Sequence, residues 1–214
     1  MGWFSSACSA IGSAFSSACS SIGRVISGAF SVVSFAVNVI STGIAICKAL
    51  GIFKQDMDSE ELGDRAIQAY DAGIRPEDYE GRFKEYREKI ENFELDPEKS
   101  KQIDANDKLK VAGNIAGWGI TDFFGQASGI GKFIKDINEN GGFYTPERAT
   151  AYLEAFKNGG MDKIGDYFNN KLDSVKDIEV VEAKLTDAEK KLGCSDEDAE
   201  ANLDQEMDRR SESS

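Results

Sequence analysis

The sequence predicts an all-α protein in which a long Ser/Gly/Ala-rich N-terminal amphipathic helix, or a helical hairpin, precedes an acidic multi-helix domain. Three observations predict this class. The first 47 residues contain one charged residue, Arg24, and repeat every eleven residues, a period of about 3.67 residues per turn that keeps the faces of a helix aligned. From Asp56 onward, helix-start and helix-stop residues separate amphipathic segments. No long alternating pattern typical of strands occurs in the chain.

The eleven-residue repeats place apolar and polar residues on opposite faces of the predicted helix. We expect the apolar face to contact lipid or another helix through Phe15, Ile22, Ile26, Phe30, Val33, Val37, Ile40 and Ile44. We expect the polar face to line a pore through Ser9, Ser13, Ser16, Ser20, Arg24, Ser27, Ser31, Ser34 and Asn38. A soluble amphipathic helix normally turns Lys and Glu to water, so a hydroxyl face indicates a membrane. Tight packing in a soluble protein and binding flat on a membrane surface are the alternatives.

The length of the apolar stretch supports membrane insertion. Residues 25–47 contain 23 residues without a charge, about 35 Å of helix against a hydrocarbon core of about 30 Å. We therefore expect a hydrophobic membrane-insertion segment at 1–53. A hairpin bent near Gly23 and Gly28 and a long helix lying in an interface both fit the pattern. The N-terminus lacks the basic region of a cleaved signal peptide, so we expect export by another route.

Charge separates this segment from the rest of the chain. Residues 1–55 carry three basic residues and no acid, whereas residues 56–214 carry 22 basic and 38 acidic residues. Such asymmetry indicates two regions with different surroundings. The net charge of −13 argues against a nucleic-acid partner. The absence of histidine excludes His-based general bases and most zinc sites, and no phosphate-binding or nucleophile motif is present, so we expect neither an enzyme nor a required cofactor.

The second region is expected to be an acidic helical domain at 56–193. Proline at first-turn positions, as in Thr145-Pro146, marks helix starts, and Thr186 with Glu189 fits a capping box. The domain should contain a Gly-rich apolar helix at 109–134, which we expect to be buried in solution and released onto a membrane.

Glycines in that helix recur as the small-xxx-small pairs Gly113/Gly117 and Gly125/Gly129, which permit close helix packing in lipid. After the domain, residues 194–214 are polar and acidic, so we expect a largely disordered tail.

Residues 136–147 resemble the calcium loop of EF-hand proteins. The resemblance implies a Ca²⁺ ion held by Asp136, Asn138, Asn140, the carbonyl of Gly142 and Glu147. The sequence departs from the pattern at Gly142 and Phe143, carries two carboxylates and shows no partner loop. An ordinary Asn-Gly-Gly turn between two helices is the alternative interpretation.

The overall architecture resembles the small pore-forming antibacterial effectors of bacterial type VI secretion systems. The charge-free 1–47 and the glycine-rich 111–134 carry this resemblance, and neither is a specific motif. The resemblance implies a protein that is soluble or carrier-bound before release, is secreted, and then inserts as a homo-oligomer into a target membrane, which it depolarises. It also implies membrane lipid, a secretion-system carrier or chaperone and a cognate immunity protein as partners.

Two other classes fit the same sequence. The start Met1-Gly2-Trp3-Phe4-Ser5-Ser6 matches an N-myristoylation pattern, which suits a viral membrane-penetration or minor capsid protein. A structural or adaptor protein would instead dock its N-terminal helix into a larger assembly without meeting lipid. Burial of the apolar face against protein would favour that third class.

Overall fold

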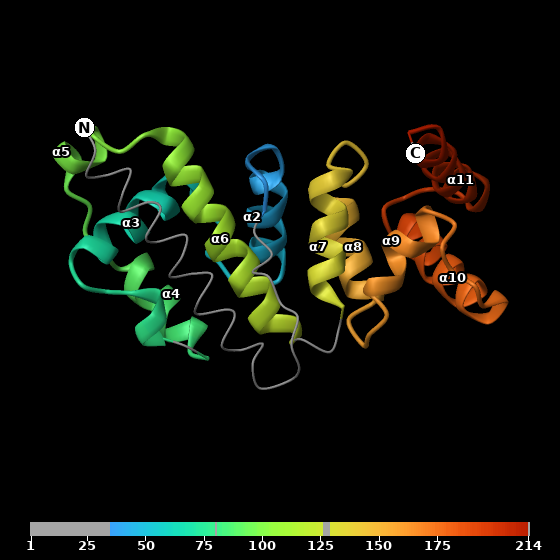
Figure 1. The fold of residues 1–214 in the computed structure, drawn as a ribbon, viewed down its shortest axis with the longest axis horizontal. Helices are drawn as coiled ribbons and strands as arrows, with labels where there is room; N and C mark the ends of the chain where they lie inside the picture. The colour runs from blue at the N-terminus through green and yellow to red at the C-terminus, as the bar shows by residue number, and fades with distance from the viewer. Residues whose placement is uncertain (1–34, 80, 126–128, 214) are drawn as a thin grey trace. The chain divides into compact units, whose positions relative to one another are not determined.

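The computed structural model describes residues 35–79, 81–125 and 129–213 (Figure 1). These residues form helices joined by turns and contain no strand, which confirms the all-α class. The chain divides into two compact units between Phe123 and Phe124. Unit 1 denotes the part of the chain up to Phe123, and unit 2 the part from Phe124 onward.

Unit 1 is built around α6. Its elements, in order, are η1 (Val37–Val39), α2 (Ile40–Ala49), α3 (Ser59–Asp71), η2 (Pro76–Tyr79), α4 (Phe83–Glu91), α5 (Pro97–Ser100) and α6 (Ala105–Phe124). Trp118 of α6 is fully buried, and its ring lies 5.1 Å from the ring of Phe83 and 5.3 Å from that of Tyr86. These aromatic contacts place α4 against α6, and burial of three large rings stabilises the unit.

Local sequence explains where the helices of unit 1 begin. The Asp58 carboxylate accepts hydrogen bonds from the backbone N–H groups of Glu60 and Glu61 and so caps α3. Asp96 caps α5 in the same way, ahead of Pro97. Such caps satisfy N–H groups that have no partner within the helix.

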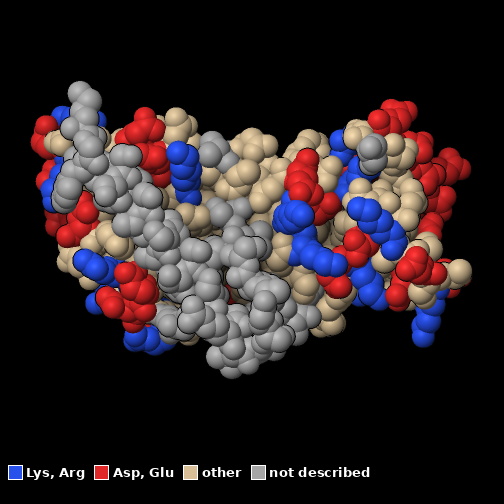
Figure 2. Space-filling view, viewed as in Figure 1, with Lys and Arg blue, Asp and Glu red and all other residues tan. Residues whose placement is uncertain are grey.

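Unit 2 contains five helices in the described residues. They are α7 (Ile130–Glu139), α8 (Pro146–Ala155), α9 (Asp162–Phe168), α10 (Val175–Lys191) and α11 (Asp196–Glu212). Helix α10 packs against α8 and α11, and α7 packs against α9 (Figure 1). Acidic side chains gather over α11, where Figure 2 shows them on the surface.

The glycine-rich segment forms parts of two helices. Helix α6 ends at Phe124, and Gly125 follows with a φ of +70°. Gly129, with a φ of +76°, precedes α7. This differs from the single helix expected over 109–134, because these glycines adopt the left-handed backbone conformation that interrupts an α-helix.

The acidic tail also differs from expectation. Residues 196–212 form α11 rather than a largely disordered tail, and Ser195 caps the helix by accepting from the N–H of Asp198. Ala199, Leu203 and Arg210 lie on its buried face.

The expected capping box at Thr186 lies inside α10, which begins after a Ser174 cap. Among the described helices, none has the length and apolar character needed to cross a bilayer.

Candidate functional site

Phe35, the first residue that the structure describes, lies in a notch formed by two glycines. We call this the entry notch and define it by Phe35, Ile40, Gly43 and Gly113. A Cβ atom on Gly43 would lie 2.5 Å from Cδ2 of Phe35, and one on Gly113 would lie 2.8 Å from the Phe35 carbonyl oxygen. Phe35 is 2% exposed. Gly43 therefore leaves room for the Phe35 ring, and Gly113 leaves room for the Phe35 backbone and the Ile40 side chain.

Helix α2 continues from the notch into the core of unit 1. Ile40, Ile44 and Cys47 are buried, and the Cys47 thiol donates to the carbonyl oxygen of Ala116 at 3.6 Å. Burial raises the pKa of this thiol well above its ordinary value, so it stays protonated and unreactive at neutral pH. Thr42, on the opposite face of α2, is 5% exposed. Protein therefore covers α2 on the Thr42 side as well, whereas Ser41 is exposed.

The structure describes only the last members of the two predicted rows. Of the apolar row, Ile40 and Ile44 contact the core of unit 1, and Val37 begins η1. Of the polar row, Asn38 is exposed. The members that lie outside the described residues are Phe15, Ile22, Ile26, Phe30 and Val33 of the apolar row, and Ser9, Ser13, Ser16, Ser20, Arg24, Ser27, Ser31 and Ser34 of the polar row.

The EF-hand-like residues lie at the end of α7 and the start of α8. Asp136 is buried, and its carboxylate accepts from both terminal nitrogens of Arg210 at 2.7 and 3.1 Å and from the hydroxyl of Tyr144. The Asn140 amide also donates to Asp136, at 3.1 Å. In the described part of the chain, no three Asp, Glu, Cys or His residues are grouped to hold a metal.

The remaining predicted ligands Asn138, Gly142 and Glu147 follow the helix–turn–helix path, with Glu147 exposed in the first turn of α8. Calcium binding stays a prediction, in which the ion must compete with Arg210 for Asp136.

The sequence did not predict the two buried ionic clusters of unit 2, although the first contains Asp136. In the first, Arg210 also donates to Glu206 at 2.7 Å, and its guanidinium lies 4.8 Å from the centre of the Phe168 ring. Burial lowers the pKa of Arg210, but the hydrogen bonds to Asp136 and the nearby negative charges outweigh that effect and raise it. This cluster, which we call the Arg210 cluster, attaches α11 to α7.

The second cluster centres on Glu189 of α10, which is 0% exposed. Its carboxylate accepts from Arg148 at 2.7 and 2.9 Å and from the Tyr152 hydroxyl at 2.7 Å. Burial raises the pKa of Glu189, but the hydrogen bonds from Arg148 and Tyr152 more than compensate and hold it below its ordinary value. Both clusters satisfy their buried charges with hydrogen bonds, which is what a structural ion pair requires.

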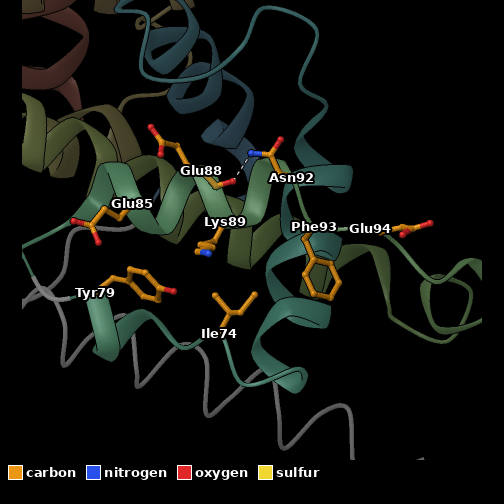
Figure 3. A pocket seen from close by; sticks show the side chains of 8 residues that line it. All are labelled: Ile74, Tyr79, Glu85, Glu88, Lys89, Asn92, Phe93 and Glu94. Atoms are coloured by element: carbon orange, nitrogen blue, oxygen red, sulfur yellow. Dashed lines mark hydrogen bonds between the residues drawn. The ribbon is translucent and has the colours of Figure 1, made fainter.

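A hollow of about 570 Å³ lies between η2 and α4 of unit 1 (Figure 3). Lys89 lies at its centre, with Tyr79 and Ile74 close to it, while Glu85 and Glu94 lie at opposite ends. Its lining residues are Ile74, Tyr79, Glu85, Glu88, Lys89, Asn92, Phe93 and Glu94. The positive charge of Lys89 at the centre and the negative charges of Glu85 and Glu94 at the ends favour neither a cationic nor an anionic ligand. This hollow therefore does not define a binding site.

The entry notch is therefore the feature that connects the described structure to the unusual N-terminal sequence. Comparison of the chain with protein-family models, with curated proteins and with solved structures finds no match.

Proposed function

We propose that the chain is a membrane-inserting, ion-conducting pore-forming protein that acts as a secreted antibacterial effector and depolarises the target membrane. The charge-free stretch at 25–47, bounded by Arg24 and Lys48, carries the proposal. Its length as a helix matches the hydrocarbon core, and its polar face offers hydroxyls rather than charges to a pore. Copies of the chain would associate through the small residues of this segment.

Current across a planar lipid bilayer after addition of the purified protein tests the proposal. Discrete current steps support a pore, and the reversal potential in a salt gradient gives its ion selectivity. The bilayer contains lipid and no other protein, so a carrier or receptor cannot account for the current. A silent bilayer together with no vesicle binding contradicts the proposal.

Substitutions on the two faces of the segment separate insertion from conduction. Ile26→Asp or Val33→Asp should abolish the current, because a charge near the bilayer centre costs about 3 kcal/mol or more. Ser27→Leu or Ser31→Leu should preserve insertion and change the conductance of each step. Equal loss in both sets would mean that the serine face lines no pore.

A structural or adaptor protein is the second candidate, and the burial of Ile40 and Ile44 in unit 1 favours it. In that function the N-terminal segment packs against protein throughout its length. Absence of vesicle binding, together with protection of the segment from proteases only in a larger assembly, would support the adaptor.

A further inference from the structure

We propose that the packed position of α2 is an internal block on membrane insertion, released when Phe35 leaves the entry notch. This inference rests on the proposed function. The 23-residue stretch 25–47 includes α2 up to Cys47, and Ile40, Ile44 and Cys47 are buried in unit 1. These residues cannot contact lipid and the core of unit 1 at the same time. Packing of α2 in unit 1 therefore excludes its insertion in a membrane.

The remainder of the stretch is too short to span a membrane alone. Residues 25–39 amount to about 22 Å of helix, against a hydrocarbon core of about 30 Å. Residues 1–23 are also free of charge but are richer in Ser and Ala. The most apolar candidate span is therefore complete only after α2 leaves unit 1.

The contacts of α2 suit reversible release. Steric fit at Gly43 and Gly113 and apolar packing hold it, and the thiol of Cys47 makes one weak hydrogen bond to Ala116. At its C-terminal end, the carbonyl oxygen of Cys47 accepts from the N–H groups of Ile52 and Phe53, and that of Lys48 accepts from the Gln55 amide. Within the described residues, no ion pair joins α2 to the rest of unit 1. Transfer of its isoleucines from protein to lipid keeps them in an apolar environment, which lowers the cost of release next to a membrane.

The turn after α2 supplies a hinge and an anchor. Gly51 is exposed and has a φ of +69°, with open space around the position of a Cβ. Directly after it, Ile52 and Phe53 are buried, and the Ile52 carbonyl oxygen accepts from Arg87 of α4. Rotation at Gly51 would break the hydrogen bonds from the N–H groups of Ile52 and Phe53 to the Cys47 carbonyl oxygen and move α2, while these two residues stay attached to unit 1.

A reversible disulfide across the notch tests the block. A Cβ on Gly113 lies 3.0 Å from Cγ1 of Ile40, so cysteines at these positions are within reach of a disulfide, whose Cβ atoms lie about 3.8 Å apart. We would make Ile40→Cys/Gly113→Cys in a background where Cys8, Cys19 and Cys194 are Ser. The Cβ of Gly113→Cys crowds the Phe35 carbonyl oxygen in both forms. Oxidised and reduced samples of one preparation therefore differ only in whether α2 is fixed to α6, and their comparison isolates the block.

Dye release from lipid vesicles is the readout. The oxidised protein should release dye at least tenfold more slowly than its reduced form, and reduction should restore the rate. Equal rates in both forms would overturn the block, since insertion would then proceed with α2 in place. If the unaltered protein releases no dye and gives no bilayer current, the proposed function fails first, and the inference falls with it.

A loosened notch provides the opposite test. Gly43→Ala places a methyl group against the Phe35 ring, whereas Ser41→Ala changes an exposed position of the same helix and is the matched control. With Cys47 as the remaining thiol, Gly43→Ala should raise its rate of maleimide labelling in the absence of lipid and should increase dye release. Faster labelling without faster dye release would contradict the block, and Ser41→Ala should change neither rate.

Discussion

At the scale of single residues, unit 2 depends on charged groups removed from water. Arg210 is 4% exposed and contacts two carboxylates, those of Asp136 and Glu206. Arginine suits this position because its planar guanidinium offers several donors in a fixed geometry. Such a cluster stabilises the fold only while all its members are present, because a single buried charge left alone is costly.

Arg210→Met should therefore destabilise unit 2 by about 3–5 kcal/mol. The substitution keeps an apolar stem of similar length but leaves Asp136 and Glu206 without their shared partner. Urea unfolding followed by circular dichroism measures the loss. Arg209→Met is the control, because Arg209 also contacts Glu206 but its side chain is 50% exposed, so the loss should be about 1 kcal/mol or less. Equal losses for the two variants would contradict the assignment of Arg210 as the central contact.

Glu189 makes unit 2 sensitive to acid. Its pKa in the folded protein lies below its ordinary value of 4.5. The ionised carboxylate therefore stabilises the fold above about pH 4.5, and the stabilisation is lost as the pH falls through the folded-state pKa. Glu189→Gln should lower the urea midpoint at pH 7 and reduce its decline as the pH falls below 4.5. An unchanged decline would assign the acid sensitivity to other groups, beginning with Glu206.

The buried clusters illustrate what sequence reasoning did not find. Arg210 and Asp136 are 74 positions apart, so no local spacing connects them. The helical spacing of Ala199, Leu203 and Arg210 could have predicted a helix with one buried face. The acidic, polar composition of the tail favoured disorder instead. Asp136 was singled out as a calcium ligand, and the structure instead surrounds it with Arg210, Tyr144 and Asn140.

At the scale of elements, close helix contacts depend on glycine. A Cβ on Gly63 of α3 would lie 1.9 Å from the carbonyl oxygen of Lys108 in α6. The two helices cross with backbone against backbone at this point. Their contact is completed by an ion pair of 2.8 Å between Lys108 and the buried Asp64. Gly63 and Lys108 are far apart in the sequence, so no local spacing predicts this contact.

Gly63→Ala should destabilise unit 1 by about 1–3 kcal/mol, because the added methyl group forces backbone atoms apart. Helix propensity alone predicts the opposite sign, a gain of about 1 kcal/mol, so the direction of the change identifies the cause. Chemical denaturation in a Trp3→Phe background, followed by the fluorescence of Trp118, measures it. Glu60→Ala, at an exposed position of α3, is the control and should change stability by less than about 0.5 kcal/mol.

Elements with strong local signals were predicted well. Thr145 caps α8 in the structure, as Thr145-Pro146 indicated in the sequence. The prediction of one helix over 109–134 was wrong. The sequence stays apolar through Gly125 and Gly129, but these two glycines have positive φ angles and interrupt the helix. The Thr186 pattern failed because α10 already begins at Val175. Local sequence thus indicates where a helix can start, and packing decides which of those starts is used.

At the scale of the molecule, charge and packing divide the chain at different places. Composition predicts a boundary between residues 53 and 56, where the acidic region begins. The structure instead groups α2 with α3 to α6 and places the boundary between Phe123 and Phe124. The reason is the entry notch, since Gly43 and Gly113 admit Phe35 and Ile40 into the core of unit 1. Hydropathy shows that α2 is apolar, but it does not distinguish protein from lipid as its apolar environment.

This division predicts two separable unfolding transitions. Each unit has its own buried core, which is the condition for a unit to unfold on its own. In a Trp3→Phe background, fluorescence reports unit 1 through Trp118, whereas circular dichroism reports the helices of both units. Arg210→Met should lower the dichroism midpoint and leave the fluorescence midpoint unchanged, and Gly63→Ala should lower the fluorescence midpoint. A single transition that both substitutions shift by the same amount in both signals would show that the units unfold together. In that case, release of α2 from unit 1 would also destabilise unit 2. The disulfide of the oxidised Ile40→Cys/Gly113→Cys protein would then stabilise both units.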